Sequence, residues 1–338
     1  MRAATSVILT FLFLFLRTPL IFGDQTPLTL IYTSNTLGEV ESCGCPETGD
    51  SGGLGRRSYY IDTVRKEVKT LLSLDGGDAL TIGLPGSEAE REKARKRTEF
   101  VLKLYEKMGY DALNIGDTDM VLGINYLKTL QESSKILFLS ANLMDKKTET
   151  PFFQPYLIKM VDGMRIGIIG LLTPDIHPFI QKELKSYFIE DPIKAALETI
   201  NRYLADCDQI IALAHLNPSE IESLAKKIPQ ISIIIGGNDR SFIFPKHIHR
   251  SIYVQTDAFG LHVGRLNLRL VKGSSEFVDG PPIRIERGFL EKETKSPDAE
   301  EKNTYENFFT LLHPEMESDP EIESMISSSR EQLKRPLP

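Results

Sequence analysis

The sequence predicts an α/β fold in which mixed β-sheets form layers flanked by helices. Short apolar runs typical of buried strands alternate along the chain with longer segments whose apolar residues recur at helical spacing. Two strand-like runs, 156–161 and 164–171, are joined by Asp162-Gly163, which is typical of a β-hairpin. The hairpin adds antiparallel pairing to a chain that otherwise alternates strands and helices, so the sheets should be mixed.

The expected strands are rich in Leu, Ile and Val and are bounded by polar residues or glycine. Besides the hairpin, they cover 28–33, 70–75, 112–115, 136–141, 209–214, 231–236, 252–256 and 265–271. Helices are expected over 88–108, 192–205 and 218–227, and a further helix should begin after a Gly-Gly turn at 52–53. The helices at 192 and 218 begin with proline after Asp or Asn, a pair that favours a helix start.

Residues 1–23 have the pattern of a secretory signal peptide, with Arg2, a short Leu- and Phe-rich run, and the small residue Gly23. The alternative is an uncleaved anchor. We expect a mature protein outside the cytoplasm, periplasmic or extracellular, with no stable membrane span after cleavage. The net charge of −7 argues against a nucleic-acid partner, because neutralising phosphates requires an excess of Lys and Arg.

We expect residues 25–289 to form one domain and residues 290–338 to form a linker and a short helical tail. From 290 to 303 the sequence is charged and poor in apolar residues, which is typical of a linker. Asp319-Pro320-Glu321 would then cap a short amphipathic helix that reaches Leu333. Such a tail would be disordered or would dock on a protein partner.

Five of the expected strands end in short polar residues, most of them next to glycine. These segments are 32–39, 74–78, 114–119, 212–216 and 236–240. Because sites in layered α/β folds lie beyond the carboxyl ends of strands, we expect the five segments to share one crevice. Carboxylates and a histidine that converge there would suit a divalent metal.

This order of segments resembles the calcineurin-like metallophosphoesterases, in particular the N-terminal domain of the bacterial, UshA-like 5'-nucleotidases. The resemblance covers 28–271 and also rests on GGLGRR (52–57), LSANL (139–143), RIGIIGLLTP (165–174) and VQTDAFG (254–260). It implies a layered metallophosphoesterase-type sandwich. It also implies an exported, metal-dependent hydrolase of phosphate esters, with a small anionic substrate such as a nucleotide.

The resemblance implies a metal site that is reduced to at most one ion. Asn35 and Leu37 stand where the family has its first Asp and His ligands, and Arg240 stands where it has a later His. Leucine has no lone pair and arginine has only donors, so that ion position should be empty. The other position keeps oxygen or nitrogen ligands and would hold one divalent ion such as Mn or Zn, through Asp78, Asp117, His215 and Asn238.

The same crevice contains candidate catalytic residues. Asp117 is a candidate catalytic residue as well as a candidate metal ligand. Asp119 is a candidate acid or base, and the alternative is an exposed loop aspartate. Arg240 would place its positive charge where the missing ion stood, toward Asp78 or a bound anion. Thr118 replaces a transition-state-stabilising histidine of the family, so hydrolysis should be slow. The alternative to a metal site is an internal ion-pair network of Asp78, Asp117 and Arg240.

Cys43 and Cys45 are separated by one glycine and follow the first strand end, so they should lie at the mouth of the crevice. A disulfide between them would close a small ring, and strained disulfides are labile or catalytic. The segment resembles the Cys-Gly-Cys group of UshA-like (seleno)proteins, which implies a redox role at one of these sulfurs. The alternative is a surface loop whose cysteines simply pair. Cys207 is expected to be a buried, inert thiol.

Three functions are therefore open from the sequence. The first is hydrolysis of phosphate esters at a reduced metal site, which Asp78, Asp117 and His215 favour. The second is thiol or redox chemistry by Cys43 and Cys45 on the same scaffold. The third is non-catalytic binding, of an anion in the crevice or of a partner through the tail.

Overall fold

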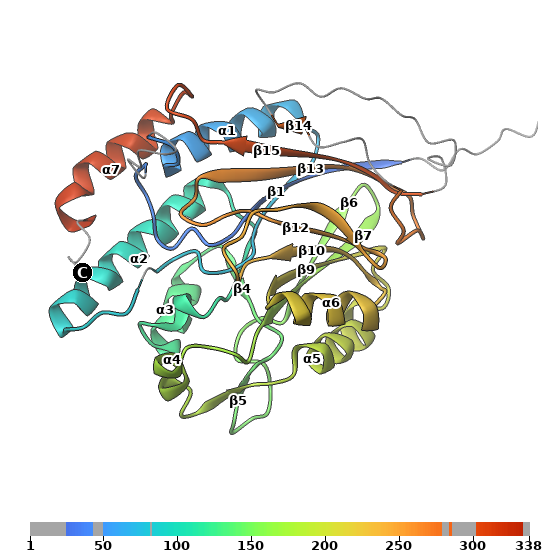
Figure 1. The fold of residues 1–338 in the computed structure, drawn as a ribbon, viewed down its shortest axis with the longest axis horizontal. Coiled ribbons are helices and arrows are strands. Elements are labelled where there is room, and N and C mark those ends of the chain that lie inside the picture. Colours follow the sequence, from blue (N-terminus) through green and yellow to red (C-terminus); the bar gives the residue numbers. More distant parts are fainter. Residues whose placement is uncertain (1–24, 43–49, 82, 279–283, 286–301, 334–338) are drawn as a thin grey trace, which may run out of the picture.

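The computed structural model describes residues 25–42, 50–81, 83–278, 284–285 and 302–333. Two large β-sheets pack against each other, and helices cover their outer faces (Figure 1). The expected α/β class with mixed sheets flanked by helices is confirmed. The expected signal peptide, 1–23, lies outside the described residues.

The first sheet has seven strands, in the order β14 (Arg284–Ile285), β15 (Thr304–Leu311), β13 (His262–Leu270), β1 (Thr26–Thr33), β2 (Leu71–Asp75), β3 (Ala112–Asn114) and β4 (Leu137–Leu139). Strands β1 to β4 are parallel, and β13 is antiparallel to β1. The carboxyl ends of β1, β2 and β3 therefore lie at one edge of the sheet.

The second sheet has six strands, in the order β11 (Ile243–Ile248), β12 (Ser251–Gln255), β10 (Ile231–Gly236), β9 (Gln209–His215), β7 (Met164–Leu172) and β6 (Tyr156–Val161). The four central strands are parallel, and β6 and β11 are antiparallel to their neighbours. The expected hairpin is the β6–β7 pair, whose turn residues Asp162 and Gly163 have φ values of +47° and +82°. A separate two-stranded sheet pairs β5 (Leu143–Asp145) with β8 (Tyr187–Ile189).

Alternation along β1 divides its side chains between two cores. Leu28, Leu30 and Tyr32 pack against the second sheet, whereas Ile31 faces the helices. The helical side of the first sheet carries α1 (Leu54–Glu67), α2 (Glu88–Met108), α3 (Ile124–Ser133), α4 (Pro178–Glu183) and α7 (Pro320–Leu333). None of the described helices is both long enough and apolar enough to cross a membrane.

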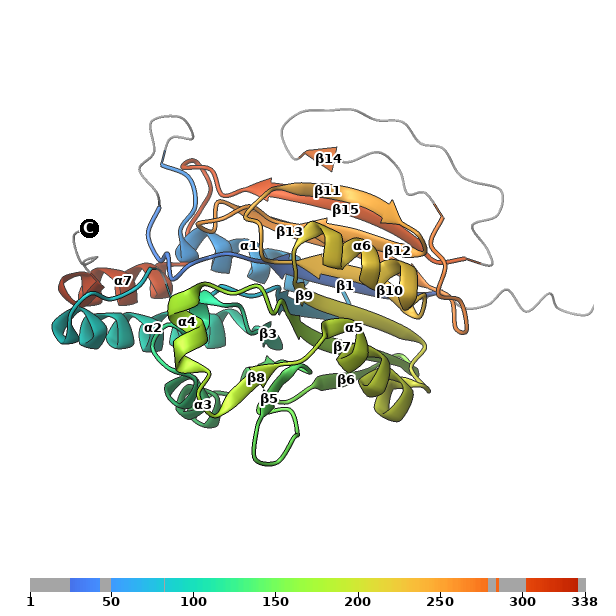
Figure 2. The same cartoon turned by 60° about the horizontal axis from the view of Figure 1, so that its bottom comes forward.

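The outer face of the second sheet is covered by α5 (Pro192–Thr199) and α6 (Pro218–Lys227), as Figure 2 shows. The helix expected over 192–205 ends its regular part at Thr199 and continues as a π-helix, Ile200–Leu204. The sandwich therefore has four layers, with the two sheets in the middle.

The segment expected to be a linker and tail contributes to the main body. Strand β15 pairs with β13 along its whole length, from His262 opposite Leu311 to Arg269 opposite Thr304. The alternation of apolar and polar residues that indicates a strand is interrupted in β15, because the polar residue Asn307 faces inward. There its Oδ1 accepts a hydrogen bond from the Tyr32 hydroxyl at 2.7 Å. The structure thus differs from the expected domain end at residue 289.

The expected helix near the end of the chain is α7, and it packs on α1 and α2. Ile322 and Ile326 are 1% and 3% exposed within the helical core. This apolar face is therefore covered by the chain itself, which differs from the expectation that it docks on a protein partner.

Candidate metal centre

Three strands bring the candidate ligands to one edge of the sandwich. Asp78 follows the end of β2, Asp117 follows β3, and His215 is the last residue of β9. Strands β2 and β3 are parallel neighbours in the first sheet, and β9 belongs to the second. The sheets meet beside these ends, because a Cβ atom added to Gly76 would lie 2.4 Å from the carbonyl oxygen of Gly236. Both sheets therefore contribute ligands to the same point.

The three side chains converge closely. One possible ligand atom from each of Asp78, Asp117 and His215 lies within 4.8 Å of the others. His215 Nε2 is 3.5 Å from Asp117 Oδ1 and 3.8 Å from Asp78 Oδ1. Asp78 and His215 are buried, and Asp117 is half-buried. Two carboxylates and an imidazole form a donor set that suits Mn²⁺, Zn²⁺ and similar ions.

Burial and mutual charge shift the pKa values of these groups. Burial raises the pKa of Asp78, and the charge of Asp117 adds to that shift, against the effect of His215. Burial disfavours the charged form of His215, but Asp78 and Asp117 outweigh it and raise the His215 pKa. Burial also opposes ionisation of Asp117, yet its contact with His215 lowers the Asp117 pKa. The two carboxylates therefore favour a positive charge here, either a proton on His215 or a divalent cation.

Several buried polar atoms at this edge lack a hydrogen-bond partner among the described residues. Nδ1 of His215 is one of them, and Nε2 of His215 has only its ion-pair contacts with Asp117 and Asp78. Within the same part of the chain, both amide atoms of Asn35 and the hydroxyl of Thr118 are also unpaired. Each such atom costs roughly 1–3 kcal/mol if it stays unsatisfied. A divalent ion and its remaining oxygen ligands would pair atoms of this kind, so the residues fit a metal ion.

The loops that carry these residues are joined in strained backbone conformations. Asn35, Leu37 and Asp78 have φ values of +52°, +55° and +57°, in the left-handed region that non-glycine residues rarely adopt. The Asn35 N–H donates to the Gly77 carbonyl at 2.9 Å, and the Leu37 N–H donates to the Asp78 carbonyl at 2.8 Å. A Cβ atom at Gly116 would lie 2.2 Å from Asp78 Oδ1, so only glycine permits this approach. Strain of this kind is typical of binding sites.

Asp119 holds the ligand loops together. Its Oδ2 accepts hydrogen bonds from the backbone N–H groups of Asp78 and Gly116, both at 3.0 Å, and its Oδ1 accepts one from Leu80 at 2.9 Å. The side chain is buried, and burial together with the charge of Asp78 raises its pKa to about 7. Both carboxylate oxygens are thus occupied by backbone donors. The burial differs from the exposed loop aspartate, and the three bonds give Asp119 a positioning role, whereas its role as an acid or base stays a prediction.

Comparison with known proteins identifies the fold. No family model matches the chain. Similar solved structures are the Thermus thermophilus sulfate thiohydrolase SoxB (TM-score 0.71, 18% identity, 92% of this chain and 60% of that one) and the calcineurin-like phosphoesterase YfkN from Bacillus subtilis (TM-score 0.70, 20% identity, 91% and 98%). The fold is that of a calcineurin-like phosphoesterase.

Curated relatives of this phosphoesterase-fold chain are named as nucleotidases or as protein UshA. They include a 2',3'-cyclic-nucleotide 2'-phosphodiesterase/3'-nucleotidase of Salmonella typhimurium (28% identity, 57% of this chain and 33% of that protein), a 5'-nucleotidase of Vibrio parahaemolyticus (26%, 70% and 48%) and protein UshA of Yersinia enterocolitica (24%, 84% and 56%). The chain spans about a third to a half of the length of such relatives. The predicted resemblance to the UshA-like metallophosphoesterases is confirmed, and the finer resemblance to the Cys-Gly-Cys group stays a prediction.

The loop after β10 carries two further candidate site residues. Asn238 is half-buried and follows Gly237, whose added Cβ atom would lie 2.3 Å from the Gly76 carbonyl, so it stands beside the ligand loops. Arg240 is exposed, with φ +57°, and forms no hydrogen bond or ion pair with the other described residues. Its charge is therefore solvated, which differs from the expected ion-pair network and from an approach to Asp78, whereas its approach to a bound anion stays a prediction.

A buried hydrogen-bond network supports the first-strand loop, and sequence reasoning missed it. Arg57 is fully buried and donates to the Tyr105 hydroxyl at 2.8 Å and to Thr36 Oγ1 at 3.1 Å. Asp75 accepts a hydrogen bond from Thr33 Oγ1 at 2.6 Å, and burial raises the Asp75 pKa to about 6. The pattern of the GGLGRR segment does not predict that Arg57 is buried, because a charged residue that faces inward adds nothing to the apolar periodicity of a helix.

The cysteines divide between the described and the undescribed parts of the chain. Cys43 and Cys45 lie outside the described residues. Cys207 is half-buried beside Gly167, and burial raises the pKa of its thiol. A thiol with a raised pKa has little thiolate, as expected for an inert cysteine.

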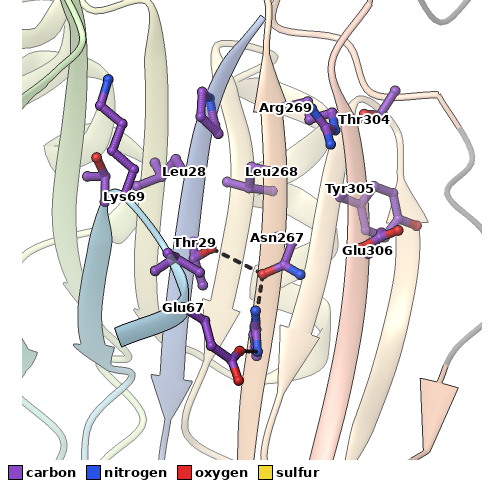
Figure 3. A pocket seen from close by; sticks show the side chains of 14 residues that line it. Leu28, Thr29, Glu67, Lys69, Asn267, Leu268, Arg269, Thr304, Tyr305 and Glu306 are labelled. Carbon is purple, nitrogen blue, oxygen red and sulfur yellow. Dashed lines mark hydrogen bonds and ion pairs between the residues drawn. The ribbon is translucent and has the colours of Figure 1, made fainter. Parts of the chain in front are cut away.

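A groove of about 400 Å³ lies on the first sheet, away from the candidate metal centre (Figure 3). It is lined mainly by β1, β13, β15 and the turn before β2, whereas Asp78 follows the opposite end of β2. Arg265 donates hydrogen bonds to Glu67 Oε2 at 3.1 Å and to Asn267 Oδ1 at 2.9 Å. Asn267 Oδ1 also accepts a hydrogen bond from Thr29 Oγ1 at 3.1 Å. These four side chains therefore pair with one another. Because the groove lies at the other end of the sheet, its residues do not contribute to the candidate metal centre.

Proposed function

We propose that this protein is a metal-dependent phosphoric-ester hydrolase that acts on nucleotides or similar small anionic substrates through at most one divalent ion. The observation that carries the proposal is the convergence of Asp78, Asp117 and His215 within 4.8 Å. Asn238, beside the same loops, completes the proposed ligand set. The nucleotidase relatives support the substrate class.

The proposal of a single ion rests on the residues around the first strand end. Leu37 is buried and has no lone pair, and Arg240 has only donors and is exposed. Within the described ranges, Asp78, Asp117 and His215 are the one group of three or more His, Cys, Asp or Glu side chains that converges. A second ion would therefore find no group of anionic or imidazole ligands of its own in the part of the chain that the structure describes.

When bound, a divalent ion would act as a Lewis acid toward a phosphoryl oxygen and lower the pKa of a bound water. Asp78 and Asp117 supply the negative charge that holds it. The Thr118 N–H donates to Asp78 Oδ1 at 2.9 Å and so orients that carboxylate. The unpaired amide N–H groups of Asn35 and the unpaired hydroxyl of Thr118, counted within the described chain, are donors that suit phosphate oxygens. Without a two-ion clamp on the attacking and leaving oxygens, turnover should be slow.

A phosphatase assay on the metal-free protein, with Mn²⁺, Zn²⁺, Co²⁺ or Mg²⁺ added singly, tests the proposal. We expect slow hydrolysis of AMP that requires an added ion and falls on the order of a hundredfold in Asp78→Ala. The exposed Asp206 provides the control, because Asp206→Ala should keep wild-type activity. Absence of hydrolysis with every ion would contradict the proposed activity. Rapid hydrolysis with two tightly bound ions would contradict the reduced site.

Export and thiol chemistry are separate proposals on residues outside the described ranges. We infer from the pattern of residues 1–23 that the protein is exported, and a mature N-terminus near residue 24 on protein from a periplasmic or culture fraction would support this. The redox role of Cys43 and Cys45 predicts that both label with an alkylating agent after mild reduction while Cys207 does not. Unreactive Cys43 and Cys45 would make their loop structural.

A further inference from the structure

An exposed phenylalanine stands on a strained turn beside the candidate metal centre. Phe259 is 39% exposed, although it is a large apolar residue. Its φ of +64° lies in the left-handed region, and Gly260 follows with +65°. A non-glycine residue in this region is strained, and a ring that stays 39% exposed gains only part of the free energy of full burial. The strain costs stability, and the partial exposure limits what packing returns.

Hydrogen bonds fix this turn to the loop that carries the metal ligand Asp78. The Phe259 N–H donates to the Asn35 carbonyl at 2.9 Å, and the Asn35 N–H donates to the Gly77 carbonyl at 2.9 Å. One residue earlier in the first-strand loop, the Ser34 N–H donates to Thr256 Oγ1 at 2.9 Å. Phe259 is therefore two backbone hydrogen bonds away from the residue that precedes Asp78. Its strained conformation is held by the site, as is typical of residues that serve a ligand.

Asn35 connects these two points of the structure through its backbone N–H and carbonyl groups. It is 0% exposed, and neither of its amide atoms has a hydrogen-bond partner in the described part of the chain. Along these hydrogen bonds, from the metal ligands outward, the order is thus an anion-attracting centre, a buried residue whose side-chain amide is unpaired within the described chain, and then an exposed aromatic ring. A phosphate ester of an aromatic or base-bearing alcohol has the same order of groups, from the anionic phosphate through polar oxygens to a planar ring.

We propose that Phe259 is a specificity-determining residue whose ring contacts a planar aromatic part of the leaving group. The site would then favour phosphate esters that carry a ring over the same esters without one. Contact between an aromatic side chain and a base contributes enough free energy for about a tenfold effect. This inference rests on the proposed hydrolase function.

AMP and ribose 5-phosphate form a matched pair of substrates, because they share the 5'-phosphate ester and differ in the base. We expect Phe259→Gly to lower kcat/KM for AMP by about tenfold and to leave kcat/KM for ribose 5-phosphate unchanged. Phe259→Trp should keep the preference for AMP. Since glycine relieves the strain at φ +64°, the Tm of Phe259→Gly should not fall, which separates lost recognition from lost folding.

Glu149→Gly is the matched control for relief of strain. Glu149 is exposed and has φ +53° in a turn after β5, so its replacement should affect neither substrate. Equal changes for AMP and ribose 5-phosphate in Phe259→Gly, or no change for either, would overturn the inference while leaving the hydrolase intact. If the wild-type protein hydrolyses neither ester with any added ion, the proposed function fails and this inference fails with it.

Discussion

Replacing Asp119 with alanine should destabilise the fold and weaken metal binding together. The carboxylate accepts three backbone hydrogen bonds, from Asp78, Leu80 and Gly116, at 2.9 to 3.0 Å. A buried donor that loses its partner costs about 1–3 kcal/mol, so we expect Asp119→Ala to lower the free energy of unfolding by about 3 kcal/mol or more. The loops of Asp78 and Gly116 would lose their common anchor. Because such supporting contacts orient metal ligands, Mn²⁺ affinity should fall about tenfold or more.

Urea unfolding of the metal-free protein and calorimetric titration with Mn²⁺ measure the two effects separately. Asp145 provides a matched control, because its carboxylate also accepts backbone N–H bonds, from Lys147 at 2.7 Å and Thr148 at 3.2 Å, but in an exposed turn. Asp145→Ala should cost about 1 kcal/mol or less and leave Mn²⁺ affinity unchanged. Wild-type stability and wild-type Mn²⁺ affinity in Asp119→Ala would refute the positioning role.

Three further predictions concern the tail and the metal ligands. Ile322→Ala should lower the unfolding free energy in urea by about 2–4 kcal/mol, because Ile322 is 1% exposed in the helical core, and a loss near zero would show that α7 does not belong to it. Asp319→Ala should cost about 1 kcal/mol at pH 7, because Asp319 accepts hydrogen bonds from Ser58 and from the first turn of α7. Burial opposes ionisation of Asp319, but these bonds lower its pKa. The contribution of Asp319 to the free energy of unfolding should therefore be present above pH about 4 and vanish as pH falls through the lowered pKa. A loss of stability in Asp319→Ala that grows toward low pH would contradict this. His215→Ala should abolish Mn²⁺ binding in calorimetry, and retained binding would place the ion elsewhere.

Elements with strong local signals could be predicted from the sequence. The helix expected over 88–108 is α2, Glu88–Met108, and its ends are marked by a capping box at Ser87 and by Gly109 at φ +74°. The helix expected over 218–227 is α6, Pro218–Lys227, which also begins with a capping box, at Asn217. In both cases the residues that set the boundary lie within one turn of it, so no tertiary contact was needed.

Elements whose inward side chains are polar could not be predicted. Strand β15 presents Asn307 to the core, where Tyr32 satisfies it, so the apolar alternation of a strand is interrupted. The charged stretch before it also suggested a linker. The partner strand β13 ends more than 30 residues earlier, at Leu270, and no local pattern reports such a pairing.

The candidate site was predictable where it depends on strand ends and unpredictable where it depends on backbone contacts. Asp78, Asp117 and His215 converge because parallel strands place their carboxyl ends at one edge. The role of Asp119 was missed because its partners are backbone N–H groups, which every residue except proline has. The exposure of Arg240 could not be predicted, because spacing alone does not reveal which way a turn directs its side chain.

Anomalous diffraction from crystals of the full chain grown with Mn²⁺ tests most directly the claim of a single ion. We predict one strong peak per chain, about 2.0–2.3 Å from ligand atoms of Asp78, Asp117 and His215. Crystals of His215→Ala grown in the same way should lack the peak. A second peak of similar height beside Asn35, or a peak that leaves His215 uncoordinated, would contradict the account.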